Sequence, residues 1–68
     1  MPELTRGQLI RSYRRELHLT QEAAADMMGV SRVSLSQWER DRIGRIHPYN
    51  IERIAHVLGI DPERLRTK

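Results

Sequence analysis

The chain has 68 residues, a formal net charge of +3 at pH 7 and no cysteine. This length suits one small domain spanning residues 1–68, and the lack of cysteine excludes disulfides and thiolate metal sites. No apolar run approaches the roughly 20 residues of a membrane span, and no signal-peptide pattern occurs at the start. We therefore expect a cytoplasmic protein with no membrane partner.

A first amphipathic helix is predicted over residues 6–17, because apolar residues recur there at spacings of three and four. Its inward stripe is expected to consist of Leu9, Ile10, Tyr13 and Leu17. Thr5 can cap the N-terminus of this helix. The arginines that lie off the stripe and should be solvated, and that could lie close to phosphates, are Arg6, Arg11 and Arg15.

Two short helices are predicted between Thr20 and Arg40. Thr20 is a good N-cap for the first, and Gly29 can end it in the left-handed conformation. Ser31 is placed to cap the second, so the turn is only about three residues long, as in a helix-turn-helix. The residues of the first helix expected to face the core are Ala24, Ala25 and Met28, and Met27 should be partly exposed.

The second of these helices has two different faces at about 100° per residue. Leu35 and Trp38 fall on the side of Ser31 and suit a core. The opposite side carries Arg32, Val33, Ser36 and Gln37. Arginine can pair with guanine, glutamine with adenine, serine with several bases and an aliphatic group with the thymine methyl. This face therefore favours reading bases in a major groove, although an ordinary solvated face would carry similar residues.

The segment from Arg40 to His47 is the most basic connection in the chain. Its arginines, expected to contact the phosphate backbone, are Arg40, Arg42 and Arg45. Gly44 should provide a turn, and Ile43 or Ile46 should fix the segment to the core. An ordinary charged loop is the alternative. All basic residues except Lys68 are arginine, which suits phosphate and guanine better than lysine does; a codon bias would give the same count.

Two further helices complete the predicted fold. Pro48 suits the first turn of one, and His47 can cap it; a lone histidine is poor support for a metal. The buried stripe of this helix is expected to be Ile51, Ile54, Ala55 and Leu58, ending at Gly59. Asp61 followed by Pro62 signals the start of a last short helix, which Leu65 should anchor. With no strand pattern, the chain is predicted to be a compact all-α, five-helix domain.

The pattern GxxIRxxRxxxxLTQxxxAxxMGVSxxxLSxWE begins at Gly7. It resembles the lambdoid phage repressor and Cro-like helix-turn-helix family, also called the xenobiotic-response-element type. The resemblance extends to Leu65 and so covers nearly the whole chain. It implies a repressor-like fold that binds double-stranded DNA, with the helix-turn-helix motif at about residues 20–39.

The resemblance also implies roles for particular residues. Gln21 should hold a phosphate at a helix N-terminus, where the helix dipole favours an anion. Thr20 and Ser31, at the same kind of position, are also expected to contact phosphate. The base-reading set that the resemblance implies is again Arg32, Val33, Ser36 and Gln37. Arg14 and Glu39 should form a partly buried ion pair that fixes helix orientation more than it stabilises.

Three positions depart from the family pattern. Ala24 stands where leucine is usual, so Leu17 or a methionine should fill that volume. Asp41 stands where glycine is common after the recognition helix, and Val33 is apolar at a base-facing position.

These residues together predict a sequence-specific transcriptional regulator, most simply a repressor, that binds a palindromic operator as a homodimer. The last helix, or the loop after the recognition helix, could form the dimer interface. Activation through contact with RNA polymerase is the other mode of action. An antitoxin that binds a toxin and regulates its own operon is the alternative function. No enzyme activity, cofactor or metal is expected, because no catalytic set, phosphate loop or metal-ligand spacing occurs.

Overall fold

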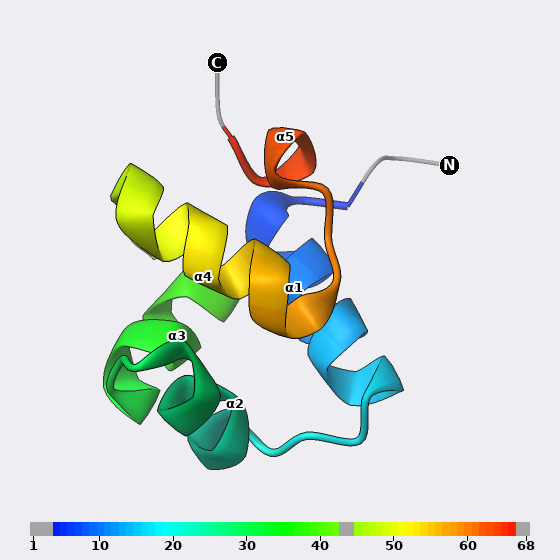
Figure 1. The fold of residues 1–68 in the computed structure, drawn as a ribbon, viewed down its shortest axis with the longest axis vertical. Coiled ribbons are helices and arrows are strands. Elements are labelled where there is room, and N and C mark those ends of the chain that lie inside the picture. The colour runs from blue at the N-terminus through cyan, green and yellow to red at the C-terminus, as the bar shows by residue number, and fades with distance from the viewer. Residues whose placement is uncertain (1–3, 43–44, 67–68) are drawn as a thin grey trace.

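The computed structural model describes residues 4–42 and 45–66 of the chain. These residues form five helices and no strand. In chain order the helices are α1 (Arg6–Glu16), α2 (Gln21–Met28), α3 (Arg32–Glu39), α4 (Pro48–Leu58) and α5 (Pro62–Leu65). Figure 1 shows α4 crossing α1, with α2 and α3 together on one side and α5 near the start of α1. The predicted all-α class is confirmed.

Each predicted helix start is capped by the expected residue. Thr5 Oγ1 accepts a hydrogen bond from Gln8 N at 3.1 Å, and Thr5 N donates to Gln8 Oε1 at 3.0 Å, which makes a reciprocal capping box. Thr20 Oγ1 accepts from Ala23 N at 3.0 Å. Ser31 Oγ accepts from Ser34 N at 3.0 Å. The chain's own side chains thus satisfy backbone donors that a helix start leaves unpaired.

The turn between α2 and α3 is short because Gly29 ends α2 in the left-handed conformation, with φ of 72°. Its N–H bonds to Asp26 O, and Val30 N bonds to Ala25 O at 3.0 Å, so the last turn of α2 closes in the Schellman manner. Thr20 and Ser31 thus cap two helices, α2 and α3, that are joined by a short turn.

One hydrophobic core joins α1 to α5. The buried apolar side chains include Leu9 and Ile10 of α1, and Ala24, Ala25 and Met28 of α2. Those from the rest of the chain are Leu35, Trp38, Ile46, Ile51, Ile54, Ala55, Leu58, Ile60 and Leu65. Ile46 therefore anchors the basic segment, as expected, whereas the predictions for Ile43 and Gly44 lie outside the described residues. None of the described helices is long and apolar enough to span a membrane.

Two expectations for α1 were wrong. Leu17 was predicted to continue the inward stripe, but its side chain is 48% exposed, because α1 ends at Glu16 and the chain reverses at His18, whose φ is 57°. Leu17 consequently does not fill the volume beside Ala24. Arg6 was predicted to be solvated, but it is half-buried and its Nη1 donates to Leu65 O at 3.3 Å, which links α1 to the end of α5.

Candidate nucleic-acid interface

Helix α3 has one face in the core and the opposite face at the surface. Leu35 is fully buried and Trp38 is 6% exposed, as their spacing predicted. On the other side Arg32 is exposed and Val33 is 58% exposed, although an apolar side chain gains nothing from contact with water. Ser36 and Gln37 are half-buried at the edge of this surface. All four side chains therefore reach the outside of the domain, along one helix.

The N-terminus of α3 is the end that carries the exposed Arg32 and Val33. No acidic residue lies in its first turn to offset the partial positive charge that the helix dipole places there. Ser31 Oγ is 3.0 Å from Ser34 Oγ and also accepts from Ser34 N. The start of α3 is thus capped by Ser31 and carries a partial positive charge, which suits an approach to a polyanion.

A buried ion pair holds α3 against α1. Arg14 Nε lies 2.6 Å from Glu39 Oε2, and Arg14 Nη2 lies 3.1 Å from Glu39 Oε1. The two side chains are only 11% and 2% exposed. Arg14 Nη1 also donates to Leu19 O at 2.8 Å, so the same guanidinium fixes the chain as it enters α2. This forked pair links α1 to the end of α3 and to the segment that leads into α2.

Gln21, the first residue of α2, belongs to the same hydrogen-bond network. Its Nε2 donates to Glu39 Oε1 at 3.1 Å. The amide nitrogen has two N–H groups, so this bond leaves one donor for another acceptor. Thr20 caps the same helix with its hydroxyl oxygen. Glu39 therefore orients the side chain that the family resemblance assigns to phosphate.

A small polar cavity of about 300 Å³ adjoins this network. It is lined by Arg11, Arg14, Gln21, Glu39 and Arg40. Arg40, predicted to contact phosphate, and Gln21 are thus brought together, one from each end of the helix-turn-helix. Arg11 was named from the sequence only as a solvated arginine that could lie close to phosphates, and was not grouped with Gln21 and Arg40. Its spacing of three from Arg14 could have indicated the shared cavity, because residues three apart share a helix face.

Asp41 explains one departure from the family pattern. Its φ is 56°, in the left-handed region where glycine is favoured. Its carboxylate accepts from Thr5 Oγ1 at 2.5 Å and from Gly7 N at 2.9 Å. The first turn of α1 has no acidic residue of its own, so Asp41 supplies the negative charge that a helix N-terminus favours.

Gly7 makes this contact between α1 and the end of α3 possible. A Cβ at Gly7 would lie 2.4 Å from Trp38 O and 2.7 Å from Glu39 O, well inside van der Waals contact. Asp41 and Gly7 therefore dock the C-terminus of α3 onto the N-terminus of α1. Gly7 begins the family pattern and Asp41 departs from it, but the sequence alone does not show that the two residues are in contact.

The basic segment after α3 does not form a single cluster. Arg40, Arg42 and Arg45 are exposed, and within residues 4–42 and 45–66 none of them is paired with a carboxylate. Arg40 lines the cavity beside Gln21, whereas Arg45 lines a different cavity at the start of α4. His47 caps α4, since its Nδ1 accepts from Tyr49 N at 3.1 Å.

A family model described as helix-turn-helix matches residues 10–65, most of the chain. The chain belongs to this helix-turn-helix family. The predicted resemblance to lambdoid repressor and Cro-like proteins is confirmed by this match and by the solved structures below. No match was found among curated protein sequences.

Solved structures of regulators superpose closely on this helix-turn-helix domain. The P22 c2 repressor in complex with a synthetic operator is 33% identical, with a TM-score of 0.84 over 93% of this chain and 94% of that one. SinR, a master regulator for biofilm formation solved in complex with DNA, is 28% identical with a TM-score of 0.83 over 90% and 97%. The restriction-modification controller protein C.AhdI from Aeromonas hydrophila is 31% identical with a TM-score of 0.80 over 90% and 91%.

Proposed function

We propose that this protein is a sequence-specific double-stranded DNA-binding transcriptional regulator, and that it represses by occupying a palindromic operator as a homodimer. The observation that carries the proposal is the orientation of α3. Leu35 and Trp38 are buried, while Arg32 and Val33 are exposed at the positive end of the helix. The family match and the likeness to regulators solved with DNA support the same function.

In this proposal α3 enters the major groove by its N-terminal end. Arg32 and Val33 then reach deepest, and Ser36 and Gln37 contact the neighbouring bases. A guanidinium can donate two bonds to guanine and an amide can pair with adenine, whereas the isopropyl group of Val33 suits a thymine methyl. These contacts provide the sequence preference.

Phosphate contacts would then orient α3 in the groove. The proposed donors and helix starts are Thr20, Gln21, Ser31, Arg40, Arg42 and Arg45, joined by Arg11 because it lines the same cavity as Gln21 and Arg40. These contacts supply affinity without sequence information. The Arg14–Glu39 pair acts indirectly, since it fixes Gln21 and α3 relative to one another.

The homodimer follows from the small footprint of one recognition helix. A single α3 reads only a few base pairs, whereas two copies about one helical turn apart read an inverted repeat. Repression by blocking a promoter needs no further domain. The homodimer and the repression by promoter blocking are both proposed for this chain by extension of its family resemblance.

Selection of bound sequences from a random pool of DNA duplexes tests the proposal. We expect enrichment of one inverted repeat, with half-sites spaced by about one helical turn. An Arg32→Ala variant carried through the same selection should lose preference at one position of each half-site. A pool that shows no enrichment after selection at low salt, with protein that is folded by circular dichroism, would contradict sequence-specific binding. Enrichment of a single half-site would retain the regulator but remove the homodimer.

A further inference from the structure

The side chain of Arg53 in α4 holds the C-terminus of α2. Its Nη1 donates a hydrogen bond to Met28 O at 2.9 Å, and the two residues are 25 positions apart in sequence. Met28 is the last residue of α2, where a backbone carbonyl has no partner within its own helix. Gly29 then begins the turn to α3. The bond therefore ties the turn between α2 and α3 to a helix that lies outside the helix-turn-helix.

The guanidinium also brings a positive charge that α2 lacks at this end. None of the residues in the last turn of α2 is basic. The partial negative charge at a helix C-terminus favours a cation, and a hydrogen bond from a charged donor is stronger than one between neutral groups. Arg53 is half-buried, which strengthens the bond because less water surrounds it.

Gly29 leaves the space that this contact needs. A Cβ at Gly29 would lie 2.5 Å from Arg53 Nη1, well inside van der Waals contact. Gly29 thus has two roles, because its φ of 72° ends α2 and its lack of a side chain admits the guanidinium. The sequence indicates only the first role, since the second depends on how α4 packs.

Tyr49 holds the same guanidinium from within α4. The Cζ of Arg53 lies 4.9 Å from the centre of the Tyr49 ring, which comes one helical turn earlier. The face of an aromatic ring attracts a cation, so this contact restricts the long side chain to conformations that reach α2. Tyr49 is 59% exposed and lies outside the hydrophobic core, so its ring contributes to this contact instead of to core packing.

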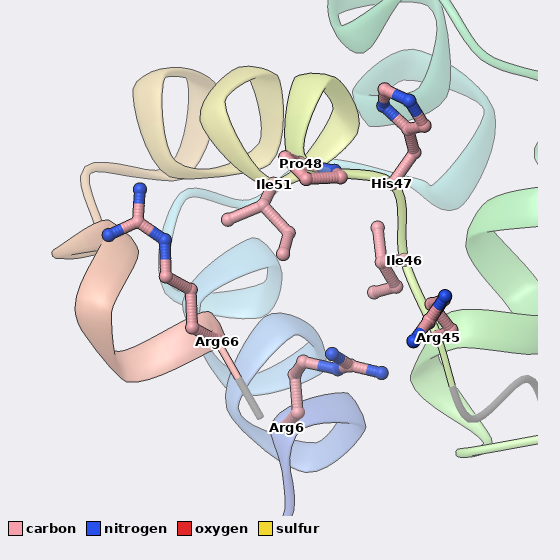
Figure 2. A pocket seen from close by; sticks show the side chains of 7 residues that line it. All are labelled: Arg6, Arg45, Ile46, His47, Pro48, Ile51 and Arg66. Carbon is pink, nitrogen blue, oxygen red and sulfur yellow. The ribbon is translucent and has the colours of Figure 1, made fainter. Parts of the chain in front are cut away.

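Helix α4 is a fixed support for Arg53. Ile51 and Ile54 are buried in the core, and so is Ile46 in the segment that leads into the helix. Figure 2 shows the side chains of Ile46 and Ile51 pointing into the cavity that both line, whereas the ring of His47 points away from them. His47 caps the first turn of α4 from that side. A bond to Arg53 therefore fixes the end of α2 relative to the core.

We propose that Arg53 is a positioning residue for DNA recognition and acts through the turn between α2 and α3. This inference rests on the DNA-binding function proposed above. Helix α2 carries proposed phosphate contacts and α3 carries the proposed base contacts, so recognition needs one fixed arrangement of the two helices. Arg14 and Glu39 link the entry to α2 with the end of α3, and Arg53 holds the opposite end of α2. Without Arg53, fewer molecules present the two helices in the arrangement that the operator requires.

Arg53→Met tests this role, because methionine keeps an unbranched apolar stem and removes the guanidinium. Affinity for the operator selected with the parent chain should fall by about tenfold, since a charge-assisted bond that favours the binding arrangement is lost. Affinity for random DNA, which needs no particular placement of α3 on the bases, should change by less than about twofold. The preference should weaken at every base pair that α3 reads. Equal losses on operator and random DNA, with a salt slope lower by about one, would mean that Arg53 contacts phosphate directly and would overturn the proposal.

Arg64→Met is the matched control. Arg64 Nη1 also donates at 2.9 Å to a group on another helix, Tyr13 Oη, and its Cζ lies 5.9 Å from the centre of that ring. This contact joins α5 to α1 and lies outside the helix-turn-helix. Each variant loses one positive charge and one hydrogen bond, so we expect similar losses of stability to urea, but a loss of selectivity in Arg53→Met alone. The same loss of selectivity in Arg64→Met would show that selectivity follows stability or net charge, and would overturn the positioning role.

Amide hydrogen exchange measures the turn without DNA. The N–H groups of Gly29 and Val30 close the last turn of α2 with bonds of 3.1 and 3.0 Å. In Arg53→Met they should exchange at least about fivefold faster than in the parent chain. The N–H groups of Gly59 and Ile60, which close α4 in a similar way, should be unchanged. Unchanged exchange at Gly29 and Val30 would contradict the proposal.

The failure of this inference can be distinguished from the failure of the proposed function. A parent chain that selects no operator would overturn the proposed function, and the recognition role of Arg53 with it. An operator that Arg53→Met binds as tightly and as selectively as the parent chain does would overturn the role of Arg53 alone.

Discussion

Arg32 and Gln37 lie on the same face of α3 and offer the two side chains best able to pair with base edges. Each can form a bidentate contact with one purine, and the loss of such a contact affects that base pair alone. Arg32→Ala or Gln37→Ala is therefore expected to cost about 1–3 kcal/mol on the selected operator and to relax the preference at one position. Competition binding against operators with single base changes would measure both effects.

Arg42 is the matched control for that measurement, because it is exposed and lies outside α3. Arg42→Ala should weaken binding to all duplexes alike and lower the dependence of log affinity on log salt by about one. If the three variants reduce binding equally on the operator and on random DNA, the assignment of base and phosphate roles is wrong.

The backbone of Asp41 is strained, whereas its side chain makes two stabilising hydrogen bonds. Its φ of 56° is strained for a residue with a side chain, and its carboxylate bonds Thr5 Oγ1 and Gly7 N. Asp41→Ala removes both bonds and keeps the strain, whereas Asp41→Gly removes both bonds and relieves it. Asp41→Ala should therefore be less stable than Asp41→Gly by about 1 kcal/mol, a difference that urea denaturation can resolve. Equal stabilities would show that the left-handed backbone is not a cost at this position.

At the scale of whole helices, the contribution of the ion pair between α1 and α3 can be tested by substitution. Glu39 is 2% exposed, so removal of Arg14 leaves a buried carboxylate without its countercharge. Arg14→Ala is expected to lower the free energy of unfolding by about 3–5 kcal/mol. The double variant Arg14→Met with Glu39→Leu should recover most of that loss, because buried ion pairs can often be replaced by apolar side chains.

DNA binding by the double variant then distinguishes an effect of the ion pair on stability from an effect on the orientation of α3. In the double variant Gln21 loses its bond from Nε2 to Glu39, and the forked contact between α1 and α3 is gone. We expect a folded protein with weakened preference for the operator. A double variant that is both stable and fully selective would show that the pair does not position α3.

The boundaries of the helices were readable because the signals are local. Thr20, Gly29 and Ser31 each act within a few residues of a helix end, and Pro48 and Asp61 do the same for α4 and α5. Leu17 was misplaced because the periodic stripe continues in the sequence beyond the point where the backbone turns at His18. Nothing in the spacing of apolar residues reports a left-handed φ.

The contacts of Asp41 were unreadable for a different reason. Its partners Thr5 and Gly7 lie 36 and 34 positions away, so the contact exists only after α1 and α3 pack. The division of the basic segment is of the same kind. Arg40 and Arg45 are close in sequence, yet they line different cavities, and Ile46 beside Arg45 is buried in the core. Which charges share a surface depends on the packing of the whole molecule.

At the scale of the whole molecule, α3 contributes one face to the hydrophobic core and presents the other to the proposed DNA surface. Trp38 is the largest side chain in a core that spans all five helices of the described chain. In so small a domain, whose total stability is on the order of 5 kcal/mol, a single large cavity can remove most of it. Trp38→Ala is therefore expected to cost roughly 3–5 kcal/mol and to leave the chain only marginally stable at room temperature, as circular dichroism and urea titration would show.

Val33→Ala, on the opposite face of the same helix, is the control for Trp38→Ala. Val33 is 58% exposed, so its truncation should change the free energy of unfolding by no more than about 0.5 kcal/mol. It should nevertheless weaken binding to the operator, because the isopropyl group is proposed to contact a base. A Trp38→Ala variant as stable to urea as the parent chain would show that the tryptophan is not needed in the core. A Val33→Ala variant that unfolds would show that the exposed face of α3 supports the fold instead of facing DNA.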